Sequence, residues 1–212
     1  MRILIFGDSI TYGAWDKEGG WVTRLRKFLD EKTLNEEDFY CLIYNLGVSG
    51  NTTGDLLERF EFEIKQRIKE KEDAMIIFAI GGNDATFINN QNQCLVSQLQ
   101  FSENIGKLIK LAEKYTAKII FTGILPCDES KTIPIPWAPD KSYKNEHIIQ
   151  YDKIIKSVCQ GKDISFIDVF NQFINLDYKN LLEDGQHPNS AGHQKIFEII
   201  KEFLIANKIF NK

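Results

Sequence analysis

The stretch RILIFGDSIT, residues 2–11, joins an unbroken apolar run to a short polar turn that contains a serine. An apolar run without polar alternation is typical of a strand that is buried on both faces, as in a parallel sheet. Four more such runs follow along the chain, at residues 40–46, 74–80, 117–124 and 163–169. The five runs predict the strands of one parallel sheet.

Segments with helical periodicity lie between the predicted strands and after the last one. Their apolar residues recur every three or four positions, at residues 21–31, 53–68, 104–115, 151–158 and 191–208. This alternation of strand and helix predicts an α/β fold in which helices cover both faces of a five-stranded parallel sheet. There is no linker, repeat or low-complexity segment in the sequence, so we expect residues 1–212 to form a single domain.

The composition excludes several classes of protein. With 43% hydrophobic and 26% charged residues, the chain is typical of a soluble globular protein rather than a disordered one. A net charge of −4, without a basic stripe, gives no indication of nucleic-acid binding. The mixed-charge run 65–74 is interpreted as a solvated helix end.

Cellular location is predicted from what the sequence lacks. No run approaches the roughly 18 apolar residues that a membrane span needs, so we expect no stable membrane insertion. The N-terminal apolar run is too short for a signal peptide, and none of the four cysteines forms a C-x-x-C pair. We therefore expect a cytoplasmic protein with reduced thiols; the sequence does not indicate an oligomeric state.

Polar segments follow the predicted strands, where ligands of open α/β sheets bind. In chain order they are GDSIT (7–11), GVSGNTT (47–53), GGND (81–84), LPCDESKTIPIPWAPD (125–140) and DGQH (184–187). Because the strands are parallel, these segments should meet at one edge of the sheet.

Three of these polar residues have the chemistry of a nucleophilic hydrolase. Ser9 follows the first strand, and a serine hydroxyl needs a neighbouring base to become a good nucleophile. His187 can be that base, and Asp184, three residues earlier, can orient it and stabilise the imidazolium. Asp8 is expected to brace the turn at Ser9.

Acyl transfer also needs donors for the oxyanion. Three candidates follow the first three strands: the backbone N–H groups of Ser9 and Gly50, and the side-chain amide of Asn83. Glycines at 81 and 82 would allow the sharp turn that presents Asn83.

GDSI around Ser9, Gly50 in VSGNT, Asn83 in GGND and His187 in DGQHPN resemble the four sequence blocks of the SGNH (GDSL) hydrolase family, in the family's order. The resemblance extends from residue 1 to about 205 and departs from the GDSL pattern at Ile10, where an apolar residue replaces leucine. It implies a flavodoxin-like three-layer α/β/α fold, with no metal or organic cofactor.

For function, the resemblance implies a GDSL-type carboxylic ester hydrolase, an esterase or lipase-like enzyme with a Ser9–His187–Asp184 catalytic triad, and an oxyanion hole of Ser9, Gly50 and Asn83. The expected partner is a small-molecule ester with a short acyl or acetyl group; the family also includes enzymes for thioesters and lysophospholipids. Walls of the substrate site are predicted at Tyr12 and Trp15, beyond Ser9, and at Ile135 and Trp137 in the proline-rich segment 125–140.

Two other classes remain open from the residues alone. Asp8, Asp84, Asp184 and His187 could be ligands of a metal-dependent phosphoesterase, although a chain with three histidines is short of ligands for a two-metal site. SGNTTGD resembles a flavodoxin phosphate loop, which would fit a non-catalytic flavin-binding module, but here it follows the second strand instead of the first.

Overall fold

The computed structural model describes residues 1–68 and 73–210. Its main sheet has five parallel strands in the order β2-β1-β3-β6-β8. Their bounds are β1 Arg2–Gly7, β2 Leu42–Gly47, β3 Ala74–Ala79, β6 Ile119–Thr122 and β8 Ser165–Ile167. With the strands counted in sequence, this is the flavodoxin-like order 2-1-3-4-5, so the predicted fold class is confirmed.

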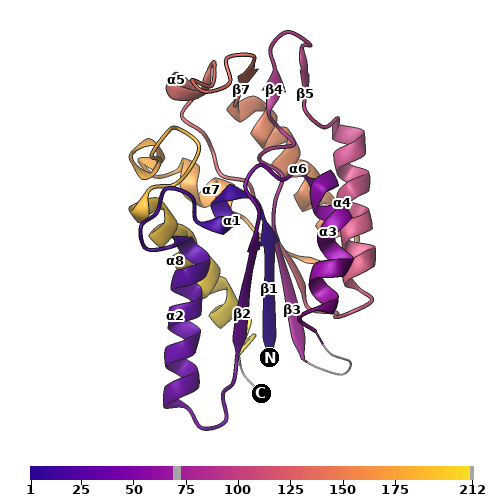
Figure 1. Cartoon of the computed structure of the whole chain (residues 1–212), viewed down its shortest axis with the longest axis vertical. Helices are drawn as coiled ribbons and strands as arrows, with labels where there is room; N and C mark the ends of the chain where they lie inside the picture. Colours follow the sequence, from indigo (N-terminus) through magenta and orange to yellow (C-terminus); the bar gives the residue numbers. More distant parts are fainter. Residues whose placement is uncertain (69–72, 211–212) are drawn as a thin grey trace.

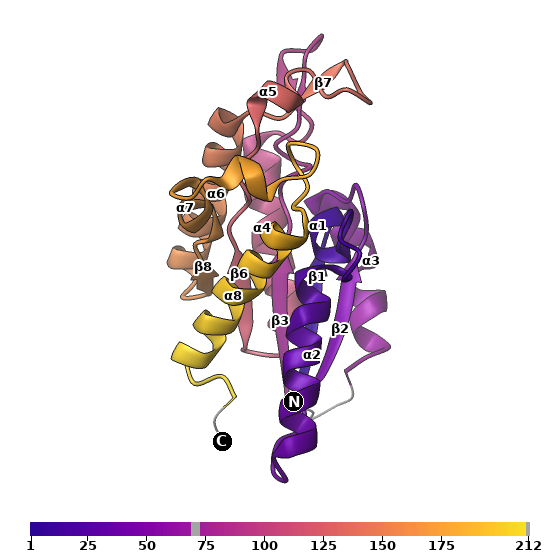
Figure 2. The same ribbon diagram turned by 90° about the vertical axis from the view of Figure 1, so that its left-hand side faces the viewer.

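Helices cover both faces of this sheet. On one face lie α2 (Gly20–Asn35), α7 (Val169–Ile174) and α8 (Ser190–Ala206); on the other lie α3 (Thr53–Lys65), α4 (Gln98–Ala112) and α6 (Asn145–Gly161). Figure 1 shows the two groups on opposite sides of the sheet, and Figure 2 shows α2 and α8 in front of it. The chain therefore has the predicted three layers.

Side-chain alternation along the strands divides the core between these layers. In β1, Leu4 and Phe6 join the cluster under α3, α4 and α6, whereas Ile3 and Ile5 join the cluster under α2 and α8. All four side chains are fully buried. A strand that is covered on both faces needs apolar residues at every position, which explains the unbroken run from Ile3 to Phe6.

The two edge strands depart from this pattern. Residues 42–44 of β2 are half-buried and Asn45 is exposed, and Ser165 in β8 is exposed. An edge strand has a neighbour on one side only, so part of its surface meets solvent. The prediction that the runs 40–46 and 163–169 are buried throughout is therefore wrong for these two strands, which are also shorter than predicted.

Polar caps set the beginnings of α3 and α8, the helices that follow the segments of Gly50 and His187. The Thr52 hydroxyl accepts from the N–H of Asp55, whose carboxylate accepts from the N–H of Thr52, which is a capping box at the start of α3. The Asn189 side chain accepts from the N–H of Gly192 at the start of α8.

Two other helices, α4 and α6, each begin six residues earlier than their apolar periodicity predicts.

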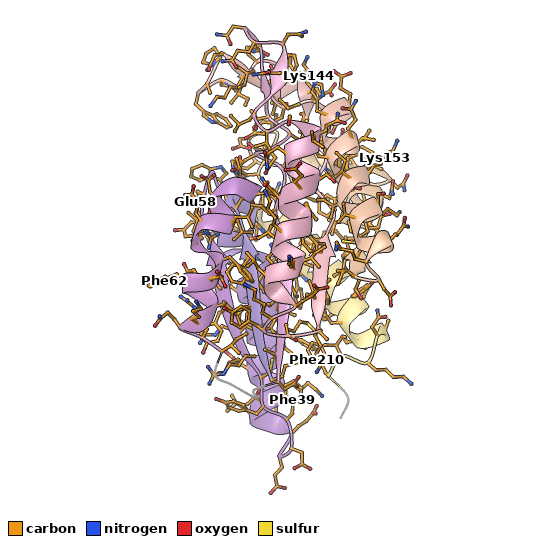
Figure 3. All side chains as sticks on the ribbon, turned by 90° about the vertical axis from the view of Figure 1, so that its right-hand side faces the viewer. Phe39, Glu58, Phe62, Lys144, Lys153 and Phe210 are labelled. Atoms are coloured by element: carbon orange, nitrogen blue, oxygen red, sulfur yellow. The ribbon has the colours of Figure 1, made fainter. Side chains whose placement is uncertain are left out.

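The outer faces of the helices are polar or solvated, as Figure 3 shows for Glu58 and Phe62 on α3 and Lys153 on α6. Residues 69–72 of the mixed-charge run lie outside the described residues. Among the described residues, no helix is long and apolar enough to cross a membrane.

Beyond the carboxyl edge of the main sheet lies a small antiparallel sheet that the sequence did not predict. It consists of β4 (Phe87–Ile88), β5 (Gln93–Cys94) and β7 (Lys141–Ser142), in the order β5-β4-β7. The short helices α1 (Ser9–Tyr12), α5 (Glu129–Thr132) and η1 (Tyr178–Leu181) are also additional. In Figure 1, β4, β5, β7 and α5 stand above the carboxyl ends of the strands.

Candidate active site

Ser9 lies at the carboxyl end of the first strand, where β1 turns directly into α1. Asp8 is the N-cap of α1, and its Oδ1 accepts from the N–H of Ile10 at 3.0 Å. Burial raises the pKa of Asp8 to about 6, against the opposing effects of that hydrogen bond and of the nearby His187. Asp8 therefore braces the turn, as predicted, and holds Ser9 at the first helical position.

A chain of hydrogen bonds links the predicted triad. Ser9 Oγ lies 2.9 Å from His187 Nε2, although the two residues are 178 positions apart in sequence. His187 Nδ1 lies 2.7 Å from Asp184 Oδ2. Since a carboxylate only accepts hydrogen bonds, Nδ1 carries the proton, and Nε2 is left to accept from the serine hydroxyl.

The Asp184 carboxylate stays ionised because its surroundings favour the charged form. Burial alone would raise the pKa of Asp184, but hydrogen bonds from the His187 side chain and from the backbone N–H groups of His187 and Gln186 lower it to about 2. Those backbone groups donate to Oδ1 at 2.8 and 3.0 Å. At neutral pH the His187 imidazole therefore faces a full negative charge.

The loop that carries Asp184 and His187 is attached to the segment after β6 and to the start of α8. On one side, the N–H of Asp128 donates to the carbonyl of Gly185 at 2.7 Å and so ties the loop to the segment after β6. On the other side, Asn189 caps α8 directly after the loop. These contacts fix the loop without requiring it to have regular structure.

The predicted oxyanion donors gather at the same cavity as Ser9 and His187. Ser9 is the first residue of α1, so its N–H has no acceptor within the helix. Gly50 has a φ of +81°, which glycine adopts readily, and a Cβ at this position would meet no atom within 4 Å. The backbone at Gly50 is therefore open to the cavity.

The amide of Asn83 is oriented by two neighbours. Its Nδ2 donates to the carbonyl of Asn51 at 3.0 Å, and its Oδ1 accepts from the Tyr143 hydroxyl at 3.3 Å. A carbonyl can only accept, so the amide nitrogen must face Asn51. Asn51 satisfies one of its two N–H bonds, and no second acceptor for Nδ2 is found among the described residues, so the other N–H can donate to a ligand.

The cavity at these residues has a volume of about 870 Å³. Aromatic side chains line it, and Tyr12, Trp15 and Trp137 are 62%, 64% and 58% exposed. Ile135, in contrast, is 2% exposed, is not among the lining residues and packs in the cluster under α3, α4 and α6. The prediction that Ile135 lines the substrate site is therefore wrong, because that side chain anchors the proline-rich segment to the core.

Three contacts of the site were not predicted. The indole Nε1 of Trp15 donates to Asp184 Oδ2 at 2.9 Å, and Tyr143 contacts Asn83 as described. Arg59, on α3, donates to the carbonyls of Gly7 and Leu46, at the ends of β1 and β2. No sequence pattern signals such contacts, because each joins segments that become neighbours only in the folded chain.

The acidic residues that could be metal ligands in a phosphoesterase already accept hydrogen bonds from protein groups. The Asp84 carboxylate accepts from the backbone N–H and the hydroxyl of Thr53, at the start of α3. Asp8 and Asp184 accept from the groups described above. Within the described ranges, no group of three or more His, Cys, Asp or Glu side chains is arranged so that it could hold a metal ion.

Comparison with known proteins assigns the family. The model of the GDSL-like lipase/acylhydrolase family matches residues 5–195. The chain belongs to this family. It is thus a GDSL-type carboxylic ester hydrolase, as its sequence blocks predict, and the match favours neither the phosphoesterase nor the flavin-module alternative.

Curated relatives of this GDSL hydrolase include esterases from distant organisms. It is 23% identical to the esterase TesA of Pseudomonas aeruginosa over 199 residues, which cover 93% of this chain and 85% of the relative. It is 25% identical to the isoamyl acetate-hydrolyzing esterase 1 homolog of Rattus norvegicus, over 92% of this chain and 78% of the relative.

Solved structures share the fold of this GDSL hydrolase. The lipase/acylhydrolase from Enterococcus faecalis superimposes with a TM-score of 0.77 at 22% identity, covering 97% of this chain and 96% of that one. The acetyl xylan esterase AlAXEase gives a TM-score of 0.74 at 20% identity, covering 96% of this chain and all (100%) of that one. At such identities the likeness concerns the fold alone.

Proposed function

We propose that this protein hydrolyses small carboxylic esters through a covalent acyl-enzyme on Ser9. The observation that carries the proposal is the hydrogen-bonded chain from Ser9 Oγ to His187 Nε2, at 2.9 Å, and from His187 Nδ1 to Asp184 Oδ2, at 2.7 Å. Nucleophile, base and orienting acid are each within hydrogen-bond distance of the next, as nucleophilic catalysis requires.

In the first half of the reaction, Ser9 Oγ attacks the ester carbonyl while His187 Nε2 takes the hydroxyl proton. The carbonyl oxygen becomes an oxyanion, which the N–H groups of Ser9 and Gly50 and the free amide N–H of Asn83 stabilise. His187 then gives its proton to the departing alkoxide, and the alcohol leaves. The acyl group remains on Ser9.

In the second half, a water molecule replaces the alcohol. His187 takes a proton from the water, the resulting hydroxide attacks the acyl carbonyl, and the bond to Ser9 Oγ breaks. Ser9 recovers its proton from His187 and the carboxylic acid is released. In both halves, Asp184 keeps a proton on Nδ1, so that Nε2 takes and returns the transferred proton, and it stabilises the imidazolium that forms in between.

We propose that the preferred substrates are esters whose acyl group is acetyl or another short chain. The cavity is bordered by exposed aromatic rings, which offer contact to the alcohol part of a small ester. The rat relative that is 25% identical carries the name of an esterase for isoamyl acetate, a short-chain ester.

Hydrolysis of p-nitrophenyl acetate, butyrate and octanoate tests this function. We expect turnover that EDTA does not reduce and a kcat/KM that falls from acetate to octanoate. Loss of activity in EDTA that added metal restores would contradict the serine mechanism. A kcat/KM that peaks at octanoate would contradict the short-chain preference and leave the mechanism intact.

We expect Asn83→Ala to lower kcat by about 10²- to 10³-fold, because it removes one oxyanion donor. KM should change little, since the donor acts mainly on the developing charge. Tyr143→Phe should give a smaller loss of kcat, because the amide keeps its bond to Asn51 and loses only one of its two orienting partners. Steady-state kinetics on p-nitrophenyl acetate provide the check, and a kcat of Asn83→Ala near wild type would remove Asn83 from the oxyanion hole.

A further inference from the structure

The indole of Trp15 contacts the triad directly. Its Nε1–H donates to Asp184 Oδ2 at 2.9 Å, and this is the same oxygen that accepts from His187 Nδ1 at 2.7 Å. Oδ1 of the same carboxylate accepts the two backbone N–H groups of Gln186 and His187. A carboxylate has about four acceptor sites, so all of them are in use and the Asp184 group has one fixed orientation.

The same indole packs against the base. The rings of Trp15 and His187 are 5.8 Å apart between centroids and nearly perpendicular, at 81°. Trp15 thus contacts both members of the pair that must stay aligned for proton transfer. With 64% of its surface exposed, it has little role in the core.

The backbone at Trp15 is held in an unfavourable conformation. Its φ of +66° lies in the left-handed region, which bulky residues rarely adopt and which costs energy. Such strain persists only where surrounding contacts over-determine it, and it concentrates at functional sites.

Those surrounding contacts are present on both sides of Trp15. The Ala14 carbonyl accepts from His193 Nε2, on α8, at 3.3 Å. The Asp16 carboxylate accepts from the N–H groups of Glu18 and Gly20 and is paired with Arg24. Arg24 in turn donates to the Ser190 hydroxyl at 2.8 Å. The Trp15 loop is therefore fixed to α2 and to the start of α8, the helix that follows His187.

We infer that Trp15 is a positioning residue of the triad, whose indole N–H holds the Asp184 carboxylate in the orientation that receives His187 Nδ1. The inference rests on the proposed serine mechanism and adds to it a function for Trp15 beyond that of a cavity wall. Without the indole N–H, the carboxylate has one acceptor site unfilled and can turn toward solvent, so that His187 is less often aligned with Ser9.

A double-mutant cycle of Trp15→Phe and Asp184→Asn tests the inference, with kcat and KM measured on p-nitrophenyl acetate. Phenylalanine keeps an aromatic ring and lacks the N–H. We expect Trp15→Phe to lower kcat about 3- to 10-fold, with KM within about 2-fold of wild type. In the Asp184→Asn background the same substitution should have almost no effect, because the carboxylate that accepts the indole N–H is then absent. Asp184→Asn alone should lower kcat strongly and leave a measurable remnant.

Two further variants separate positioning from other roles. Trp137→Phe removes an indole N–H from the same cavity. In the described part of the chain no hydrogen bond joins Trp137 to the triad, so any effect of this variant should fall on KM and be the same in both backgrounds.

Trp15→Asn places a residue that tolerates the left-handed region at the strained position. It should lower kcat at least as much as Trp15→Phe without lowering the melting temperature, which a merely structural role would not produce.

The outcomes distinguish failure of the inference from failure of the proposed function. Full activity of Asp184→Asn would overturn the triad itself. A weakened Asp184→Asn together with a fully active Trp15→Phe would overturn only the inference. Equal loss from Trp15→Phe in both backgrounds would also overturn it, because the indole would then act independently of Asp184.

Discussion

We expect Ser9→Ala to lower kcat on p-nitrophenyl acetate by at least about 10⁴-fold, because it removes the proposed nucleophile of the triad. The substitution deletes one oxygen atom, which has His187 as its hydrogen-bond partner at 2.9 Å. Among the residues that the structure describes, Ser9 Oγ is the hydroxyl that His187 Nε2 contacts, so acyl transfer should not begin without it. What activity remains should come from water and the oxyanion donors alone.

The fold should survive this change. Ser9 is 6% exposed, and alanine fits the first position of a helix without strain. Losing a hydrogen bond of this kind typically costs about 1 kcal/mol of unfolding free energy. Wild-type circular dichroism and a melting temperature within a few degrees of wild type are the controls, and an active, folded Ser9→Ala would exclude Ser9 as the nucleophile.

His187→Ala is the second change with a very large expected effect, again a loss of at least about 10⁴-fold in kcat. Removing the imidazole leaves Ser9 with no base and the leaving alkoxide with no acid. Because the two residues act as a unit, the Ser9→Ala/His187→Ala double variant should be no slower than either single variant. Steady-state kinetics on the three variants provide the measurement.

Added imidazole makes the His187 prediction specific. The alanine variant opens space at the cavity beside Ser9, and a small free base there should restore part of the activity. The double variant, which lacks the nucleophile, is the matched control and should show no recovery. Activity in His187→Ala close to wild type, or equal recovery in both variants, would contradict the role of His187 as base.

Much of the fold followed from the sequence because the central strands are buried on both faces. Such strands leave unbroken apolar runs, and β1 shows this from Ile3 to Phe6. The burial of the edge strand β2 was predicted less well. Exposed positions of an edge strand can also hold apolar residues, so its run resembles that of a fully buried strand. The small sheet of β4, β5 and β7 was missed because its strands have two residues each, too few to produce a periodic pattern.

Where chemistry restricts the residue type, the residues predicted from the sequence lie together in the structure. Ser9, Asp184 and His187 have side chains that acyl transfer uses in defined roles. Ser9 comes at the end of β1, as ligand sites of α/β folds do, whereas the loop of Asp184 and His187 comes after β8, α7 and η1. The residues that line the substrate cavity were harder to predict, because an apolar residue such as Ile135 can either line a cavity or anchor a loop. Ile135 anchors the loop, and Trp15 has a contact with Asp184 that depends on a backbone conformation no pattern predicts.

Covalent labelling with diethyl p-nitrophenyl phosphate, followed by peptide mass spectrometry, tests the central claim most directly. The reagent loses p-nitrophenolate to an activated serine and leaves a stable diethylphosphoryl ester on its oxygen. The account predicts one label per chain on Ser9, loss of esterase activity in parallel with labelling, and no labelling of Ser9→Ala or His187→Ala. A label on another residue with full loss of activity, or full activity in the labelled protein, would contradict it.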